Sequence, residues 1–267
     1  MKLTIKQQEY LNNATRRWNV KSGATRSGKT YLDIMAVIPL RTRHVQGKPG
    51  LTVFLGNTRG TLQRNIIEPL QSLYSSRLVG DIGADNTARI FGEKVYCLGA
   101  DKVTQVDRLR GSSIKYAYCD EVVTYNNEVF EMLKSRLDKP YSRCDLTCNP
   151  DSPMHWFKKF MDSDADIYLQ EYSIDDNDFL PSDFVENLKK EYTGTVWYDR
   201  YTAYLAEILT SRKPRFIGHH LIAVSIFNAA ATQSIHLCYL VSPQAVNLLS
   251  KYPWQVGAGR RVDLSDV

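Results

Sequence analysis

The chain has 267 residues, a length that allows one domain of ordinary size with an appendage. Apolar residues at 43% and charged residues at 24% are close to the averages for soluble globular proteins, which excludes disordered, collagen-like and membrane-bundle classes. The net charge is +5, but residues 211–267 carry six basic and two acidic side chains, so the first 210 residues are nearly neutral. Nucleic-acid binding would therefore depend on local patches rather than on net charge.

The N-terminal segment and the cysteines bear on the compartment of the protein. Residues 1–18 are polar and lack the apolar stretch and cleavage site of a signal peptide, so we expect a cytoplasmic protein without a membrane segment. The five cysteines form neither a disulfide framework nor a paired zinc pattern, and we expect reduced thiols. They are Cys97, Cys119, Cys144, Cys148 and Cys238, of which Cys144 and Cys148 are predicted to be buried in a strand.

Short apolar runs alternate with helical patterns along the chain, which predicts an α/β fold with a mainly parallel sheet flanked by helices. Strands are expected over residues 17–20, 51–56, 112–121, 143–149 and 167–174, with two shorter strands around Gly92 within residues 87–99. Helices are expected over residues 28–42, 58–74, 101–111, 126–138 and 152–162, followed by two amphipathic helices within residues 175–207. The third helix should end at Gly111, and the fifth should begin with Ser152 as its N-cap and Pro153 as its first residue.

The segment GATRSGKT, residues 23–30, matches the pattern G-x-x-x-x-G-K-[ST] in full and lies between a predicted strand and a predicted helix. In such a phosphate-binding loop, inward-turned backbone N–H groups hold phosphates, the lysine reaches the β and γ phosphates, and the last hydroxyl binds Mg²⁺. The alternative is a glycine-rich turn that caps an ordinary helix. The nucleotide-binding residues predicted here are Gly23, Ala24, Thr25, Arg26, Ser27, Gly28, Lys29 and Thr30, with Thr30 also a Mg²⁺ ligand.

The segment IKYAYCDE, residues 114–121, predicts a second part of the same site. Asp120 ends an apolar-leaning strand, where its carboxylate can hold Mg²⁺, and Glu121 can polarise an attacking water. A carboxylate at a strand end can instead cap the next helix. Two acids in tandem favour hydrolysis, and the absence of an NKxD segment favours ATP over GTP.

With these motifs in place, the sequence resembles the large terminase subunit of tailed phages and prophages, the motor that packages DNA into capsids. The resemblance covers about residues 3–205. Five segments carry it: LTIKQQEYL (residues 3–11), GATRSGKT (23–30), the run from RLRGSS to KSRL (108–137), LTCNPDSPMHWF (146–157) and DDNDFLPSDFVENLKKEYTGTVWYDRY (175–201). The family implies a phosphate-loop ATPase of the additional-strand, catalytic-glutamate type with a small helical lid.

The resemblance also implies roles for residues to which motif spacing alone would assign no function. Gln7 would contact the adenine, and Arg26 would act on the phosphates within the loop. Thr147 and Asn149 would sense the γ phosphate, although on their own chemistry they are only a strand end and a turn. Arg110 is the first candidate, and Arg136 the second, for an arginine finger acting on a neighbouring subunit.

The family further implies a homo-oligomeric ring working with double-stranded DNA, a portal protein and a small terminase subunit. Contacts to DNA would be to phosphates and independent of sequence. The candidates are Arg59, Arg64, Lys158 and Lys159, for each of which a solvated surface charge is the alternative.

The family pattern stops before the end of the chain. Full-length members carry a nuclease domain that uses clustered carboxylates, and residues 211–267 contain only Asp263 and Asp266. We therefore expect an ATPase core over residues 1–175, a helical lid over 176–210, and a divergent tail over 211–267 without nuclease activity. Two alternatives are a helicase-like translocating ATPase and an inactive remnant of a truncated terminase.

Overall fold

The computed structural model describes residues 2–149, 152 and 154–192, together with the backbone of four short strands between residues 215 and 238. The chain divides into two compact units, residues 1–204 and 205–267. In the second unit, β8 (Arg215–Ile217) pairs antiparallel with β9 (His220–Ile222), and β10 (Ser225–Ile226) with β11 (Leu237–Cys238). The first unit contains every residue predicted above to belong to the site.

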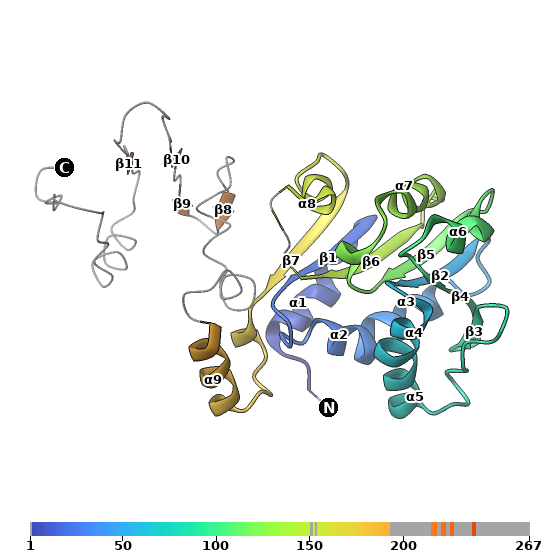
Figure 1. Ribbon diagram of the computed structural model, residues 1–267, viewed down its shortest axis with the longest axis horizontal. Helices are drawn as coiled ribbons and strands as arrows, with labels where there is room; N and C mark the ends of the chain where they lie inside the picture. Colours follow the sequence, from blue (N-terminus) through green and yellow to red (C-terminus); the bar gives the residue numbers. More distant parts are fainter. Residues whose placement is uncertain are drawn as a thin grey trace, which may run out of the picture. The chain divides into compact units, whose positions relative to one another are not determined.

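A seven-stranded sheet forms the centre of the first unit, in the order β3-β4-β2-β5-β6-β1-β7 (Figure 1). Its strands are β1 (Trp18–Gly23), β2 (Leu51–Gly56), β3 (Thr87–Ile90), β4 (Glu93–Gly99), β5 (Ile114–Cys119), β6 (Arg143–Cys148) and β7 (Ile167–Tyr172). All neighbours pair in parallel except β3 and β4, whose hairpin turns through Phe91 and Gly92 at φ of 48° and 85°. The predicted mainly parallel sheet is confirmed, and β6 is the additional strand between β1 and β5.

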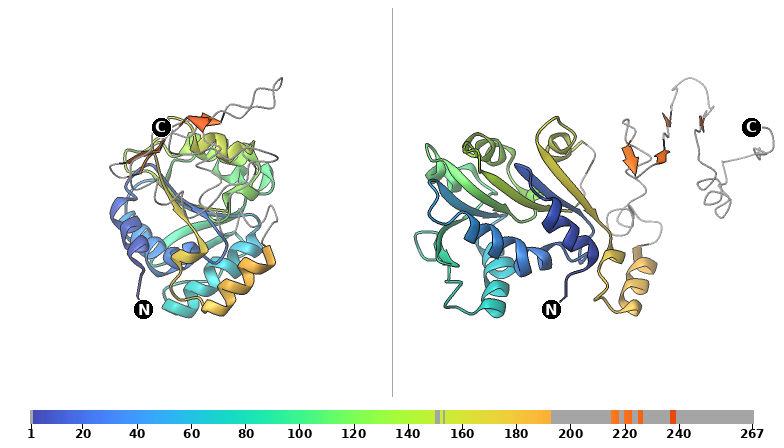
Figure 2. Two further views of the ribbon diagram at one scale, coloured as in Figure 1. Left: turned by 90° about the vertical axis from the view of Figure 1, so that its left-hand side faces the viewer. Right: turned by 180° about the vertical axis from the view of Figure 1, so that it is seen from behind.

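Helices cover both faces of this sheet, as Figures 1 and 2 show. One face carries α1 (Ile5–Asn13), α2 (Lys29–Leu32), α3 (Ile38–His44), α4 (Arg59–Leu62) and α5 (Glu68–Tyr74), and the other carries α6 (Val103–Val106), α7 (Asn127–Arg136) and α8 (Trp156–Met161). Alternation along β5 divides the core accordingly. Tyr116 and Tyr118 pack in the cluster under α3–α5, whereas Ala117 and Cys119 pack in the cluster under α7 and α8.

The two helices predicted to follow β1 and β2 each contain a π-helical segment that the sequence analysis did not foresee. These segments are Asp33–Val37 and Gln63–Ile67. A proline lies two residues beyond each segment, and Pro39 has no N–H to donate to the carbonyl of Met35. The hydroxyl of Tyr74 donates to that carbonyl at 2.7 Å, so the irregular turn leaves no unpaired acceptor there.

The helix predicted over residues 101–111 is shorter than expected. It consists of α6 and a 3-10 turn over Asp107–Leu109. Gly111 has a φ of 80°, which confirms the left-handed conformation predicted at its end.

The predicted start of α8 is wrong. Its N-cap is His155, whose ring Nδ1 accepts a hydrogen bond from the Phe157 N–H at 3.2 Å. The Ser152 hydroxyl oxygen instead accepts from the Met154 N–H at 3.2 Å, so it closes the turn before the helix. The predicted first residue, Pro153, lies outside the described residues.

Of the two amphipathic helices predicted after β7, the first is α9 (Ser182–Tyr192), and the second falls outside the described residues. Cys144 and Cys148 are buried in β6, as predicted. In the part of the chain that the structure describes, no helix combines the length and the apolar composition required to span a bilayer.

Candidate functional site

The predicted phosphate loop connects β1 to α2. Its backbone has φ values in the left-handed region at Gly23 (141°), Arg26 (62°) and Gly28 (88°), a conformation that glycine adopts readily and arginine rarely. The Ser27 hydroxyl donates to the Ala24 carbonyl at 2.7 Å, which braces the loop from within. The result is a tight loop at the start of a helix, the arrangement that binds phosphates in other proteins.

Gly23 lies where the loop touches the end of β7. The Ala24 N–H donates to the Tyr172 carbonyl at 2.9 Å. A Cβ atom at Gly23 would lie 1.8 Å from that carbonyl oxygen, well inside the 3.0 Å below which Cβ atoms essentially never approach another heavy atom. Glycine is therefore required at this position by the close approach of β7 as well as by its φ.

Lys29 is buried at the centre of the loop. Its ammonium donates to the carbonyls of Gly23 and Ala24, at 2.8 Å and 2.6 Å, and to Asn149 Oδ1 at 3.2 Å. Burial lowers the pKa of Lys29 to about 8, while the carboxylate of Glu121 acts to raise it. A desolvated cation bonded only to neutral oxygens gains from an anionic ligand, so this pocket fits the phosphates of a nucleotide.

The two acids follow β5 directly. Asp120 is buried, and burial raises the pKa of its carboxyl group to about 6, against the lowering effects of hydrogen bonds from Thr147 and Asn65 and of the Lys29 charge. Glu121 is exposed and has a φ of 53°, a left-handed conformation that costs a residue other than glycine about 1–3 kcal/mol. The carboxylate of Asp120 and the hydroxyl of Thr30, half-buried in α2, fit Mg²⁺, which binds few protein oxygens and keeps phosphate and water ligands.

The end of β6 joins the phosphate loop to the acids. The Thr147 hydroxyl donates to Asp120 Oδ1 at 3.1 Å and accepts from the Glu121 N–H at 3.0 Å. Asn149, one residue beyond β6, accepts from Lys29. Thr147 therefore contacts the two acids and Asn149 contacts the lysine of the phosphate loop, and both are residues to which the family resemblance assigned a role.

Gln7 lies against the phosphate loop, and its amide is already bonded on both sides. The amide nitrogen donates to the Gly28 carbonyl at 3.1 Å, and the oxygen accepts from the Thr4 N–H at 2.9 Å in the capping box of α1. Gln7 thus ties α1 to the loop, and its contact with adenine remains a prediction.

The segment that leads to α9 holds the outer side of the loop. The Asn177 amide donates to the Arg26 carbonyl at 2.7 Å. The Arg26 guanidinium lies 5.0 Å from the ring centroid of Phe184 in α9, within the range of a cation–π contact. The predicted phosphate-contacting arginine therefore contacts α9, the helix predicted to begin the lid.

The structure places the two finger candidates apart from these contacts. Arg110 is exposed and forms an ion pair with Asp107 at 2.7 Å. Arg136 ends α7, and its buried Nε has no hydrogen-bond partner among the described residues.

The four predicted DNA contacts do not form one continuous surface. Arg59 and Arg64 lie on the helix that begins at α4, and Lys158 and Lys159 lie on α8, so the two pairs are on opposite faces of the sheet (Figure 1). Arg59 donates to the Ile82 carbonyl at 2.8 Å, and Lys158 pairs with Asp162 at 2.9 Å.

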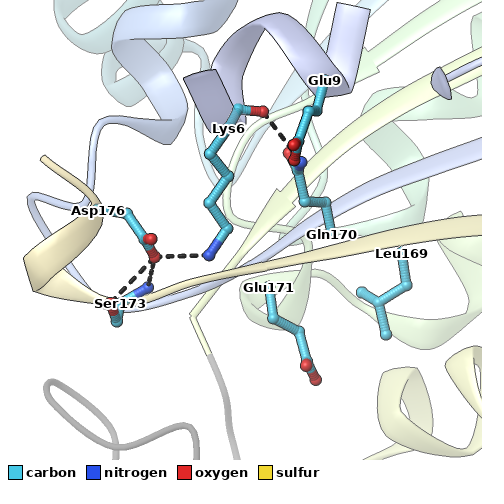
Figure 3. Close-up of a pocket in the computed structure, with 7 residues that line it drawn as sticks. All are labelled: Lys6, Glu9, Leu169, Gln170, Glu171, Ser173 and Asp176. Atoms are coloured by element: carbon cyan, nitrogen blue, oxygen red, sulfur yellow. Dashed lines mark hydrogen bonds and ion pairs between the residues drawn. The ribbon is translucent and has the colours of Figure 1, made fainter. Parts of the chain in front are cut away.

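A surface groove of about 480 Å³ runs along the outer side of β7, between α1 and the 3-10 turn Ile174–Asp176 (Figure 3). It is lined by Lys6, Glu9, Leu169, Gln170, Glu171, Ser173 and Asp176. Its polar groups are largely bonded to one another, since Lys6 pairs with Asp176 at 2.7 Å and Gln170 donates to the Lys6 carbonyl at 3.0 Å. No residue of the predicted nucleotide site lines this groove.

Sequence reasoning missed several residues of the site, including Asn65, Asn177 and the Tyr172 backbone. Each acts by a contact with a partner more than fifty residues away in the chain. In the sequence, only their proximity to recognised motifs could have indicated that these residues belong to the site.

Comparisons with known proteins agree with this geometry. The profile of the family described as "Terminase large subunit, T4likevirus-type, N-terminal" matches residues 21–209. The large terminase of a thermophilic bacteriophage is similar in structure at 25% identity and a TM-score of 0.67, over 77% of this chain and 54% of that one. The complex of the same phage protein with ADP gives 25% identity and a TM-score of 0.64, over 75% and 52% of the two chains.

A further solved structure agrees in fold alone. The ATPase domain of the Thermus phage P74-26 large terminase is 13% identical with a TM-score of 0.54, over 75% of this chain and 92% of that one. The present chain spans about half the length of the large terminase from the thermophilic bacteriophage. Among curated protein sequences, none matches at a significant level.

Replacing Gly23 with alanine tests the close approach of the loop to β7. We expect Gly23→Ala to displace the loop and weaken binding of a fluorescent ATP analogue by about 100-fold or more, because the added Cβ would overlap the Tyr172 carbonyl. The matched control is Gly60→Ala in α4, where a Cβ meets only side-chain atoms at 3.8 Å and beyond. Equal affinity of the two variants in a fluorescence titration would contradict the requirement for glycine at position 23 and the role of this loop in nucleotide binding.

Proposed function

Because this chain belongs to the family of T4-type phage terminase large subunits, we propose that it is the ATP-hydrolysing motor domain of a DNA-packaging terminase. One observation carries the proposal: the end of β6 links the loop lysine to both acids, since Asn149 accepts from Lys29 while Thr147 bonds the Asp120 carboxylate and the Glu121 N–H. A helicase-like ATPase, the alternative, is not favoured, since the matching profile and structures are those of large terminases.

ATP bound with Mg²⁺ would supply a transferable phosphoryl group whose developing charge the metal neutralises. Lys29 and Arg26 would hold phosphate oxygens, and Thr30 and Asp120 would hold the metal. Glu121 lies beside Asp120, exposed at the same edge, where its carboxylate orients a water molecule and accepts its proton. Thr147 fixes both acids, since it bonds the side chain of one and the backbone of the other.

Asn149 gives the site a means of responding to phosphate. Its side chain is one of four acceptors that share the three donor hydrogens of the Lys29 ammonium. A phosphate that binds Lys29 competes with Asn149 for that position, and loss of the γ phosphate returns the bond. The change would be passed along β6 through Thr147 to the acids.

The wider assembly is also part of the proposal. In the cytoplasm of a bacterial host cell, the chain would act as a homo-oligomeric ring with a portal protein and a small terminase subunit, translocating double-stranded DNA. The support is the family match over residues 21–209. Arg110, exposed at the turn after the 3-10 helix, would complete the site of a neighbouring subunit.

Glu121→Gln tests the assignment of the water-activating residue. We expect ATP turnover to fall by about 100-fold to 10,000-fold, since the amide cannot accept the proton, while the affinity for an ATP analogue stays within about twofold. Lys29→Ala should lose both turnover and binding. Turnover by Glu121→Gln at the wild-type rate would remove Glu121 from this role, and absence of turnover in the wild-type chain would favour an inactive remnant.

Linear double-stranded DNA should stimulate the turnover of ATP regardless of its sequence. Because the contacts would be to phosphates, we expect stimulation at 50 mM salt to fall by about tenfold or more at 200 mM. The measurement is turnover with two duplexes of unrelated sequence at both salt concentrations. Stimulation by only one duplex, or stimulation that salt does not reduce, would contradict phosphate contacts.

Mixing two inactive variants tests Arg110 as a residue that acts between subunits. Arg110→Ala retains Glu121, and Glu121→Gln retains Arg110, so a mixed ring contains sites with both groups. We expect the mixture to recover a measurable fraction of wild-type turnover, whereas each variant alone recovers none. The same mixture with Arg136→Ala in place of Arg110→Ala distinguishes the second candidate, and no recovery in the first mixture would exclude Arg110.

A further inference from the structure

A buried ion pair lies beneath the phosphate loop, and neither the sequence motifs nor the proposed mechanism uses it. Lys21 Nζ in β1 lies 2.9 Å from Asp33 Oδ1, and both side chains are fully buried. The Tyr118 hydroxyl in β5 donates to the second oxygen, Asp33 Oδ2, at 3.2 Å. Asp33 therefore contacts both the strand that enters the phosphate loop and the strand that ends at Asp120.

Asp33 lies one helical turn beyond the residues that would hold phosphate and metal. Its backbone N–H points to the carbonyls of Lys29 and Thr30. It is also the first residue of the π-helical segment Asp33–Val37, and such segments occur frequently at functional sites. A shift of the Asp33 side chain would move the first turn of the helix, and Lys29 and Thr30 with it.

The register of the sheet places both partners of Asp33 next to the candidate site. Lys21 is paired with Thr147 across β1 and β6, and Thr147 donates to Asp120. Tyr118 is two residues before Asp120 in β5. The pair thus lies between the two halves of the site, on the face of the sheet covered by α1–α3.

A contribution to folding stability does not by itself explain why Lys21 and Asp33, rather than apolar residues, occupy these buried positions. Burying an ion pair removes both groups from water, and apolar residues of similar volume commonly stabilise a fold as well or better. Leu32 and Val37, which flank Asp33 along the same helix, pack in an apolar cluster, so apolar side chains also fit beneath this helix beside its charged groups. The directional contact is the hydrogen bond from the Tyr118 hydroxyl to Asp33 Oδ2, while Lys21 holds the other carboxylate oxygen as an ion pair, so the carboxylate is held from two strands.

We propose that Asp33, held by Lys21 and Tyr118, is a positioning residue that fixes the first turn of the phosphate-loop helix over β1 and β5. It thereby sets where Lys29 and Thr30 lie relative to Asp120. This inference rests on the proposed ATP site, and it adds three residues, none of which would touch the nucleotide.

Tyr118→Phe is the most selective test, because it removes one hydroxyl and leaves the ring in the core. The matched control is Tyr116→Phe, on the same strand and the same face, whose buried hydroxyl has no hydrogen-bond partner among the described residues. We expect Tyr118→Phe to raise amide hydrogen exchange in residues 23–33 by about threefold to tenfold and to lower kcat for ATP by about tenfold. Tyr116→Phe should change neither, and identical behaviour of the two variants would overturn the proposal.

Charge removal gives a second, independent test. Asp33→Asn and Lys21→Met should each lower the melting temperature, because each leaves one buried charge unpaired. The double variant should regain most of the melting temperature while its exchange in residues 23–33 stays fast and its kcat stays low. Recovery of exchange and kcat together with melting temperature would overturn the proposal and leave the pair a purely structural role.

The two readouts separate this inference from the proposed function. Hydrogen exchange needs no nucleotide, so it measures positioning even in a chain that does not hydrolyse ATP. A wild-type chain without turnover would overturn the proposed function, whereas equal exchange in Tyr118→Phe and Tyr116→Phe would overturn the positioning role of Asp33.

Discussion

The parallel pairing of β1, β6 and β5 is the constraint on which the rest of the site depends. Because all three strands run in the same direction, their carboxyl ends meet at one edge of the sheet. The phosphate loop leaves β1 there, Asp120 leaves β5, and Asn149 follows β6. A residue that is distant in sequence needs only the correct register to reach the site.

Register alone would leave the loop free to move, and contacts from several elements hold it. The Tyr172 carbonyl at the end of β7 blocks one side, and Gln7 from α1 bonds the Gly28 carbonyl. Asn177 and Asn149 bond the loop from two further directions. Because the loop is ordered by these contacts, less of the entropy of ordering it would oppose phosphate binding.

How much could be foreseen from the sequence differs between local and distant features. The phosphate loop, the hairpin around Gly92 and the end at Gly111 were predictable, because glycine signals positive φ within a few residues. The N-cap of α8 was not, since Ser152 and His155 both have acceptor side chains and only the packing decides between them. The two π-helical segments could not be predicted either, because packing decides where a helix departs from regular α geometry. A proline follows each segment, but the sequence pattern alone does not distinguish a π-helical turn from an α-helical one.

The least predictable part is the band of charge between two apolar clusters on the face covered by α1–α3. It contains the Lys21–Asp33 pair and a second pair, Arg41 with Asp145, whose other oxygen accepts from Tyr10 at 2.9 Å. Lys21 and Asp145 occupy the polar positions that alternate with apolar residues in β1 and β6, so the pattern predicts a solvent-exposed face. Their burial depends on the helices that cover this face, which the strand pattern does not reveal.

Removing one member of a buried pair costs about 3–5 kcal/mol, whereas replacing both with apolar residues is commonly neutral. A single mutation that removes one partner is therefore strongly destabilising, so the two charge pairs are difficult to lose one residue at a time, even where stability does not require them. Apolar contacts have no fixed direction, so a helix on a purely apolar face could slide or rotate at small cost. Two charge pairs along the helix that runs from α2 to α3 fix both its ends, and they leave its first turn at one place above the strands that carry the site.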